Sequence, residues 1–234
     1  MEPVVCVSHE PSVTPGIAVE VFGELGVPLR VMRAWEEVQW PAPDAMSGLV
    51  VLGGDMNADA LDAYPFLKRV RALVSAAIGR GLPTLGICLG AQIMTRALGG
   101  VVRRSPRVEL GFGPLDATDE GRRDPVFGVF ADDVAVFQWH EDTFDLPPGA
   151  TLLLRGGGLV QAFRYGPAAY AAQFHFEVTQ ADIAAWIEDT PPDRLQDYWG
   201  WSAEALLEAA HSQLPAQQHA GRDAFRRFAM LLAA

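Results

Sequence analysis

The chain has 234 residues, of which half are hydrophobic and a fifth are charged, and its formal net charge is −11. This length suits one α/β domain with a full core, or at most two small domains. The acidic balance disfavours a nucleic-acid or anionic-membrane partner, because binding phosphate groups requires clustered Lys and Arg.

Short apolar runs and amphipathic stretches alternate in the first part of the chain. Apolar runs predict strands at residues 4–8, 29–32, 48–52 and 83–87. Helical spacing of apolar residues predicts helices at residues 15–25, 64–78 and 91–98. Strands and helices in this alternating order indicate a parallel sheet with right-handed crossovers.

The character of the sequence changes after the third predicted helix. Short β-like runs follow at residues 101–103, 134–138, 151–154, 161–164 and 169–176, and then helical patterns at residues 180–188, 203–214 and 223–232. We predict an α/β fold with an open, mostly parallel, mixed sheet that has helices on both faces. Residues 1–180 are expected to form one domain, with residues 181–234 as a helical C-terminal extension packed on it.

The cysteines and the first residues bear on the cellular location of the protein. Cys6 and Cys88 are too few for a disulfide framework or a metal-binding set. The first residues read as a strand rather than a signal peptide, and no apolar run is long enough to cross a bilayer. We therefore expect a cytoplasmic protein with no membrane partner.

Cys88 follows the strand predicted at residues 83–87, in the sequence Gly86-Ile87-Cys88-Leu89-Gly90. Gly-x-Cys-x-Gly between a strand and a helix is the layout of a nucleophile elbow, in which a strained turn lifts the side chain above the sheet edge. The positive end of the helix dipole favours a thiolate there, and the N–H of Leu89 would donate to an oxyanion. The alternative is a small buried cysteine that only packs against the helix.

A thiol nucleophile needs a base and a group that orients it. His175 and Glu177 are two residues apart in a strand-like run, so their side chains would share one face. Gly53 and Gly54 directly follow the strand at residues 48–52 and would present an N–H at the same sheet edge. The alternatives are the exposed polar face of an edge strand and an ordinary glycine turn.

Together these motifs resemble the class I glutamine amidotransferase family, the type with a Cys-His-Glu triad and a flavodoxin-like sheet. The resemblance is carried by GICLGAQ, QFHFEVT and the Gly53-Gly54 turn, and it covers about residues 1–180. The sequence is most similar to the amidotransferase domain of GMP synthase, but as a stand-alone protein without a synthetase domain.

The resemblance implies cysteine-dependent hydrolysis of the γ-amide of glutamine through a γ-glutamyl thioester. Cys88 would be the nucleophile, His175 would carry protons, and Glu177 would orient His175. The amides of Gly54 and Leu89 would hold the oxyanion.

The resemblance also implies four substrate contacts and a partner. Gly53, Gln92, Trp139 and His140 would contact glutamine or another γ-glutamyl molecule. No metal or organic cofactor is expected. Because no synthetase motif is present, ammonia would pass to a separate synthetase subunit.

Three residues depart from the motifs usual in this family. Phe176 stands where proline is usual between the His and the Glu, and it would face away from the site. Asp55 stands where proline is common, and it would change the oxyanion turn or add negative charge. Glu141 stands where glycine is common, and it would alter the rim of the pocket.

Other functions remain open. A hydrolase of γ-glutamyl peptides or amines resembles the same family, and a regulatory or binding protein would keep the site without activity. A metal enzyme using His175 and Glu177 would leave Cys88 unexplained, and a related thiol enzyme with a cysteine elbow would not account for Gln92. The aromatic run at residues 197–201 would pack the terminal helices or form a lid or partner surface.

Overall fold

The computed structural model describes residues 2–36, 39–131 and 133–232, so the ends of the predicted ranges 1–180 and 181–234 lie outside the described residues. A single eight-stranded sheet runs through this part of the chain. Its parallel part has the order β2 (Leu29–Arg33), β1 (Val4–Ser8), β3 (Gly48–Val51), β4 (Thr84–Ile87) and β10 (Ala169–Ala172). Antiparallel strands continue it, in the order β9 (Leu159–Tyr165), β8 (Ala150–Gly156) and β6 (Asp116–Ala117).

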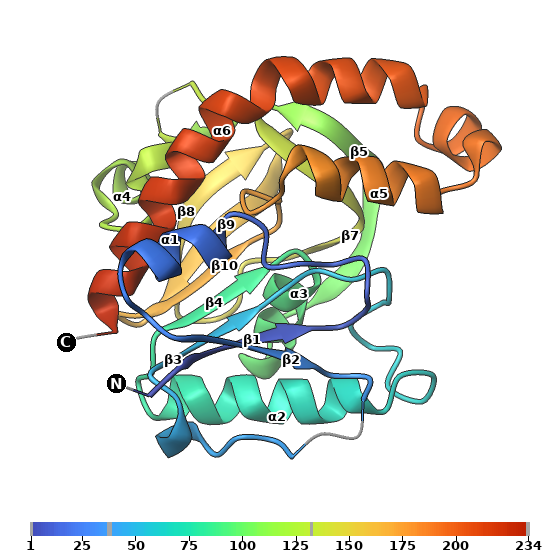
Figure 1. Cartoon of the computed structure of the whole chain (residues 1–234). Helices are drawn as coiled ribbons and strands as arrows, with labels where there is room; N and C mark the ends of the chain where they lie inside the picture. The colour runs from blue at the N-terminus through green and yellow to red at the C-terminus, as the bar shows by residue number, and fades with distance from the viewer. Residues whose placement is uncertain (1, 37–38, 132, 233–234) are drawn as a thin grey trace.

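Alternation along the strands sends side chains to two apolar layers, one on each face of the sheet. Val4 and Cys6 belong to one layer, while Val5 and Val7 belong to the other. The first layer is covered by α1 (Ala18–Glu24) and α6 (Ala203–Leu231), and the second by α2 (Phe66–Gly79) and α3 (Leu89–Ala97) (Figure 1). The predicted α/β fold with helices on both faces is therefore confirmed.

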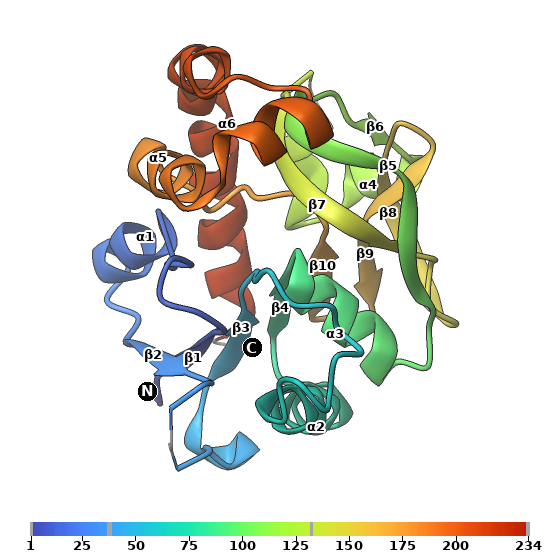
Figure 2. The same cartoon turned by 90° about the vertical axis from the view of Figure 1, so that its right-hand side faces the viewer.

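A second, two-stranded sheet stands apart from the first and frames one side of the site (Figure 2). It consists of β5 (Val102–Gly113) and β7 (Val136–Phe144), and it packs against α5 (Gln180–Asp189) and the first half of α6. The predicted strands at residues 101–103 and 134–138 are much too short. Most of β5 is exposed or half-buried, so it lacks the apolar alternation that marks a strand. The short helix α4 (Asp119–Arg123) and strand β6 had no clear signal either.

Two further predictions are wrong in their bounds. β10 ends at Ala172 rather than residue 176, because pairing with β9 stops there and the chain crosses toward β7. The helices predicted at residues 203–214 and 223–232 are one helix, although Pro215 lies inside it. Proline in a helix interior costs about 3 kcal/mol, and two apolar layers offset this by burying both halves of α6.

No helix in the described ranges combines the length and the apolar character that a membrane span requires. The longest of them, α6, is amphipathic, with buried positions on one side and exposed Arg and Glu on the other.

Candidate active site

Cys88 sits in a strained turn between β4 and α3. Its φ of 52° and ψ of −109° fall where residues with a side chain rarely lie. Its N–H donates to the carbonyl of Ala172 at 2.8 Å. A Cβ on Gly90 would lie 2.0 Å from the carbonyl oxygen of Val51, so helix α3 approaches β3 as closely as only glycine allows. The geometry of the predicted elbow is present.

His175 and Glu177 lie in the irregular segment that follows β10. Nδ1 of His175 and Oε1 of Glu177 are 2.7 Å apart, and the two side chains are 4% and 1% exposed. Phe174 and Phe176 point into the core on the other side, as predicted for Phe176. Side chains in this segment therefore point alternately to two sides, as in a strand, although the segment does not form one.

The electrostatics of His175 favour its charged form. Burial acts to lower its pKa, but the carboxylate of Glu177 and then the side chain of Cys88 oppose this and raise the pKa to about 10. The ring of Trp186 from α5 lies edge-on to the imidazole at 4.9 Å. Because Nδ1 donates to Glu177, Nε2 is the nitrogen left to exchange a proton with Cys88.

The glycine turn after β3 is held by two residues that follow β1, and sequence reasoning missed both. Nδ1 of His9 donates to the carbonyl of Gly53 at 2.8 Å, and Oε1 of Glu10 accepts from the N–H of Asp55 at 2.8 Å. Burial lowers the pKa of His9 to about 4, so His9 is neutral near pH 7. The turn therefore has a fixed conformation on both sides of Gly54.

The two residues predicted to donate to an oxyanion lie next to one another: a Cβ on Gly54 would lie 3.0 Å from Cδ2 of Leu89. The N–H groups of Gly54 and Leu89 have no hydrogen-bond partner within the described ranges. Gly54 lines two cavities, and Cys88 lines them both as well. Gly53 lines neither cavity: a Cβ there would lie 2.9 Å from Cε1 of His175 and 3.6 Å from Cβ of Cys88. Its predicted substrate contact stays a prediction.

The two cavities meet at Cys88 and share Asp55 and Asp189, but arginines line only the larger one. The larger one, of roughly 560 Å³, is lined by polar and aromatic residues that include Gln92, Arg104, Trp139, His140, Asp142 and Arg194. The smaller one, of roughly 180 Å³, holds His175 and Trp186 and three acidic residues, Glu10, Asp55 and Asp189. A substrate bound across Cys88 would therefore have one part on each side of the sulfur.

Gln92 and Gln173 form a buried amide pair beside the nucleophile. Nε2 of Gln173 donates to Sγ of Cys88 at 3.6 Å, while Oε1 of Gln173 accepts from Gln92 at 3.4 Å. Gln92 also donates to the carbonyl of Asp142 at 3.3 Å. Sequence reasoning missed Gln173, although it precedes His175 by two residues and shares its face.

Trp139 and His140 lie at the site as predicted, in different environments. The ring of Trp139 packs against Trp186 at 5.9 Å, and both cavities touch Trp139. Nε2 of His140 lies 3.1 Å from Oε2 of Glu109 in a buried network. Burial acts to raise the pKa of Glu109, but contact with His140 and further polar partners holds it below the usual value.

The segment after α5 closes one side of the larger cavity. Thr190, Pro191, Arg194 and Trp199 line it. Arg194 binds Glu141 at 2.8 Å, and Arg104 pairs with the other oxygen of the same carboxylate. Of the predictions for the aromatic run, packing is confirmed, since Trp199 is buried against the terminal helices, and Trp199 also lines the cavity. A lid or partner surface stays a prediction. Within the described ranges, no three potential metal-ligating side chains cluster.

Comparison with known proteins identifies what this arrangement is similar to. The profile of the family described as "Glutamine amidotransferase class-I" matches residues 13–189, which include Cys88, His175 and Glu177. The glutamine amidotransferase-like protein YfeJ of Salmonella typhimurium is 29% identical over 187 residues, 78% of each chain. The crystal structure of a glutamine amidotransferase from Thermotoga maritima matches with a TM-score of 0.86 at 30% identity, over 97% of both chains.

A longer relative matches in part. The GMP synthase (glutamine-hydrolyzing) of Thermomicrobium roseum is 28% identical over 194 residues. These residues are 80% of the present chain and 34% of that protein, so the chain spans about a third of its length.

Proposed function

The chain belongs to the class I glutamine amidotransferase family, and on this basis we propose that it hydrolyses the γ-amide of glutamine through a thioester on Cys88. The observation that carries the proposal is the strained elbow of Cys88 facing His175, whose other nitrogen is bound by buried Glu177. A buried thiol with a paired imidazole is the arrangement of an activated nucleophile.

The proposed reaction has two steps. Cys88 gives its thiol proton to Nε2 of His175 and its Sγ attacks the amide carbon, while the N–H groups of Gly54 and Leu89 hold the oxyanion that forms. The carbon–nitrogen bond breaks as Nε2 of His175 gives its proton to the leaving nitrogen, which releases ammonia. Water then loses a proton to His175 and attacks the thioester, and glutamate leaves as Cys88 regains its thiol form.

Side chains of the larger cavity would bind the glutamyl part of the substrate. Gln92, Trp139 and His140 supply polar and aromatic contacts there, and Arg104 offers positive charge for the α-carboxylate. At the rim, the carboxylate of Glu141 joins Arg104 to Arg194 and holds both guanidinium groups in place.

We also propose a separate synthetase subunit as the acceptor of ammonia. The relative from Thermomicrobium roseum is named as a synthase that hydrolyses glutamine, and the present chain matches a third of it. Cys6 and Cys88 are free thiols, and a thiol nucleophile must stay reduced, which favours a cytoplasmic location.

One observation favours a second candidate, the hydrolysis of a γ-glutamyl amine. The smaller cavity lies on the side of His175, where the leaving group departs, and is lined by three acidic residues. Burial and then the charges of Asp55 and Asp189 raise the pKa of Glu10 to about 7. Such a cavity would hold an amine that carries a second positive charge better than it would hold ammonia alone.

Glutamate release tests both candidates. The purified chain and Cys88→Ala are compared on L-glutamine, γ-glutamyl-putrescine and γ-glutamylglycine, and the thioester is trapped by acid quench and mass spectrometry. Cys88-dependent turnover of glutamine supports the amidotransferase reaction. Preference for γ-glutamyl-putrescine that Glu10→Gln weakens supports the amine hydrolase, because Glu10 lines the smaller cavity and not the larger one. Turnover that survives in Cys88→Ala contradicts Cys88 as the nucleophile. No turnover of any substrate by the wild type contradicts a hydrolase and favours a binding protein.

A further inference from the structure

His175 lies outside the regular sheet, so something else must hold its backbone. Its N–H donates to the carbonyl of Phe137 in β7 at 2.8 Å, and these two residues form an isolated antiparallel bridge. In a complete bridge of this kind the two residues exchange both hydrogen bonds. Here the second bond, from the N–H of Phe137 to the carbonyl of His175, is not made directly.

The side-chain amide of Gln217 fills the place of that second bond. Its Oε1 accepts from the N–H of Phe137 at 2.5 Å, and its Nε2 donates to the carbonyl of His175 at 3.0 Å. Gln217 is fully buried on α6 and lines neither cavity. The amide thus satisfies two buried backbone groups at once and sets the spacing between β7 and the segment that carries His175.

Further contacts show that α6 follows this segment closely. Nε2 of Gln218 donates to the carbonyl of Val178 at 3.0 Å. A Cβ on Gly221 would lie 2.5 Å from the carbonyl oxygen of Phe176, so the helix touches the backbone between His175 and Glu177. Residues 175–178 therefore rest against one turn of α6.

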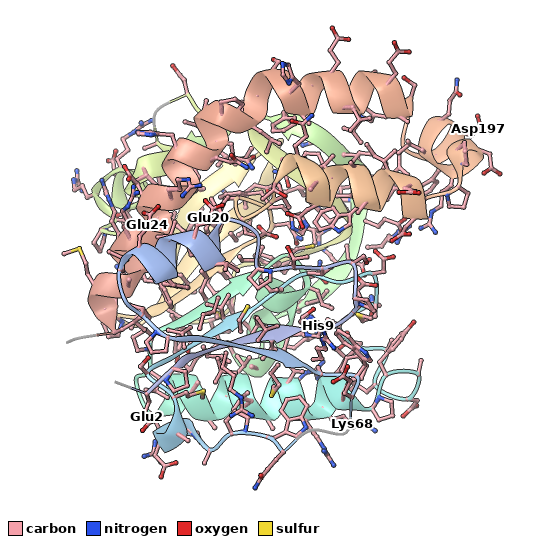
Figure 3. All side chains as sticks on the ribbon, in the orientation of Figure 1. Glu2, His9, Glu20, Glu24, Lys68 and Asp197 are labelled. Atoms are coloured by element: carbon pink, nitrogen blue, oxygen red, sulfur yellow. The ribbon has the colours of Figure 1, made fainter. Side chains whose placement is uncertain are left out.

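The helix is itself anchored beside the N-terminal part of the chain (Figure 1). Arg222 and Arg226 pair with Glu20 and Glu24 on α1, which lie side by side on the outer surface (Figure 3). The N–H of Ile17, just before α1, donates to the carbonyl of Glu177 at 2.9 Å. The His175 segment is thus held between α1 and α6.

We propose that α6 is a positioning element of the active site and that Gln217 is the positioning residue that places the His175 imidazole against Cys88. The inference rests on the proposed function, because it assigns His175 a part in the reaction. Without the inserted amide, Phe137 and His175 would either keep two unpaired buried groups or close the gap and move the imidazole. A displacement of about 1 Å at a reacting group lowers turnover about a hundredfold.

The test compares Gln217→Met with Phe228→Leu, a buried core change about three turns further along the same helix at a residue that lines neither cavity. The readouts are kcat and KM for the γ-glutamyl substrate that the wild type hydrolyses, and the pH profile of Cys88 alkylation by iodoacetamide, followed by mass spectrometry. We expect Gln217→Met to lower kcat at least about tenfold with KM changed less than about twofold, and to alter the alkylation profile. Phe228→Leu should lower only the melting temperature.

If Gln217→Met does not fold, Gln217→Glu takes its place in the test. It keeps the length of the side chain and the oxygen that accepts from Phe137, and it loses the N–H that donates to His175. A folded variant at Gln217 with wild-type kcat and an unchanged alkylation profile overturns the inference. So does a loss of kcat that Phe228→Leu reproduces. If the wild type hydrolyses nothing, the proposed function fails. The alkylation profile depends on the position of His175 and not on turnover, so it still tests the role of Gln217.

Discussion

Replacing Glu177 with glutamine is the sharpest test of the candidate site. Oε1 of Glu177 and Nδ1 of His175 are 2.7 Å apart, and the second carboxylate oxygen is buried without a hydrogen-bond partner in the described ranges. Glu177→Gln keeps the shape of the side chain and removes its charge. If the new amide N–H faces Nδ1, the imidazole must move its proton to Nε2, where it can no longer accept the proton of Cys88.

Two effects then lower the rate together. The carboxylate is the main influence that raises the pKa of His175 against the effect of burial. The variant therefore lowers that pKa and disfavours the charged form of the imidazole. The altered tautomer removes the base. A loss of the orienting carboxylate in such a triad lowers kcat by roughly 10²–10⁴-fold, which corresponds to about 3–5 kcal/mol of barrier.

The assay measures kcat for glutamate release and the rate of Cys88 alkylation from pH 5 to pH 10. Glu109→Gln is the matched control, because Glu109 is a half-buried carboxylate that also lies beside a histidine: its Oε2 is 3.1 Å from Nε2 of His140. We expect Glu177→Gln to reduce alkylation near neutral pH, while Glu109→Gln leaves the alkylation profile unchanged. A folded Glu177→Gln protein with kcat within about threefold of wild type would refute the assignment of Glu177.

Three other predictions concern the elbow and its supports. Gly90→Ala should lower the free energy of unfolding by about 3 kcal/mol in urea titrations, since its Cβ would lie 2.0 Å from the carbonyl oxygen of Val51, whereas Gly23→Ala, with open space around it, should be neutral or slightly stabilising. Gln173→Leu should slow Cys88 alkylation about tenfold, because it removes the N–H that donates to Sγ, and an unchanged rate would argue against that role. Folding shifts the pKa of His9 down to about 4 from 6.5, so its contribution to stability is present above pH 6.5 and is lost as the pH falls toward 4. Wild type should lose about 3 kcal/mol more than His9→Gln between pH 7 and pH 4, and equal losses would contradict a neutral buried His9.

The sequence predicted those parts of the site that lie within one local pattern. The strand, turn and helix around Cys88 follow from an apolar run and two glycines, and the shared face of His175 and Glu177 follows from alternation. The contacts that hold these parts join distant segments, such as His9 with Gly53 and Glu10 with Asp55. Local spacing carries no information on such pairs, and a polar residue that supports a buried turn looks like any surface residue.

Helix α6 is a second feature that local sequence patterns do not predict. The helical patterns at residues 203–214 and 223–232 predict two helices, and Pro215, which lies between them, is a weak point in a helix. One continuous helix is stabilised because both of its halves are buried. Leu206, Ala210 and Leu214 pack in one apolar layer, and Phe225 and Phe228 pack in another. Gln217 lies between these two apolar stripes, so only the tertiary structure reveals that its amide completes a backbone bridge.

The region beyond residue 189, where the family profile ends, contributes to both functions of the site. Arg194 and Trp199 form one wall of the larger cavity, and Gln217 holds the segment that carries His175. If the proposed function holds, Arg194 and Trp199 would act on which glutamyl compound binds, and Gln217 would act on how fast it reacts. The chain can therefore carry the motifs that the family profile matches and still differ in substrate from other members, because part of the wall and the support come from residues beyond residue 189.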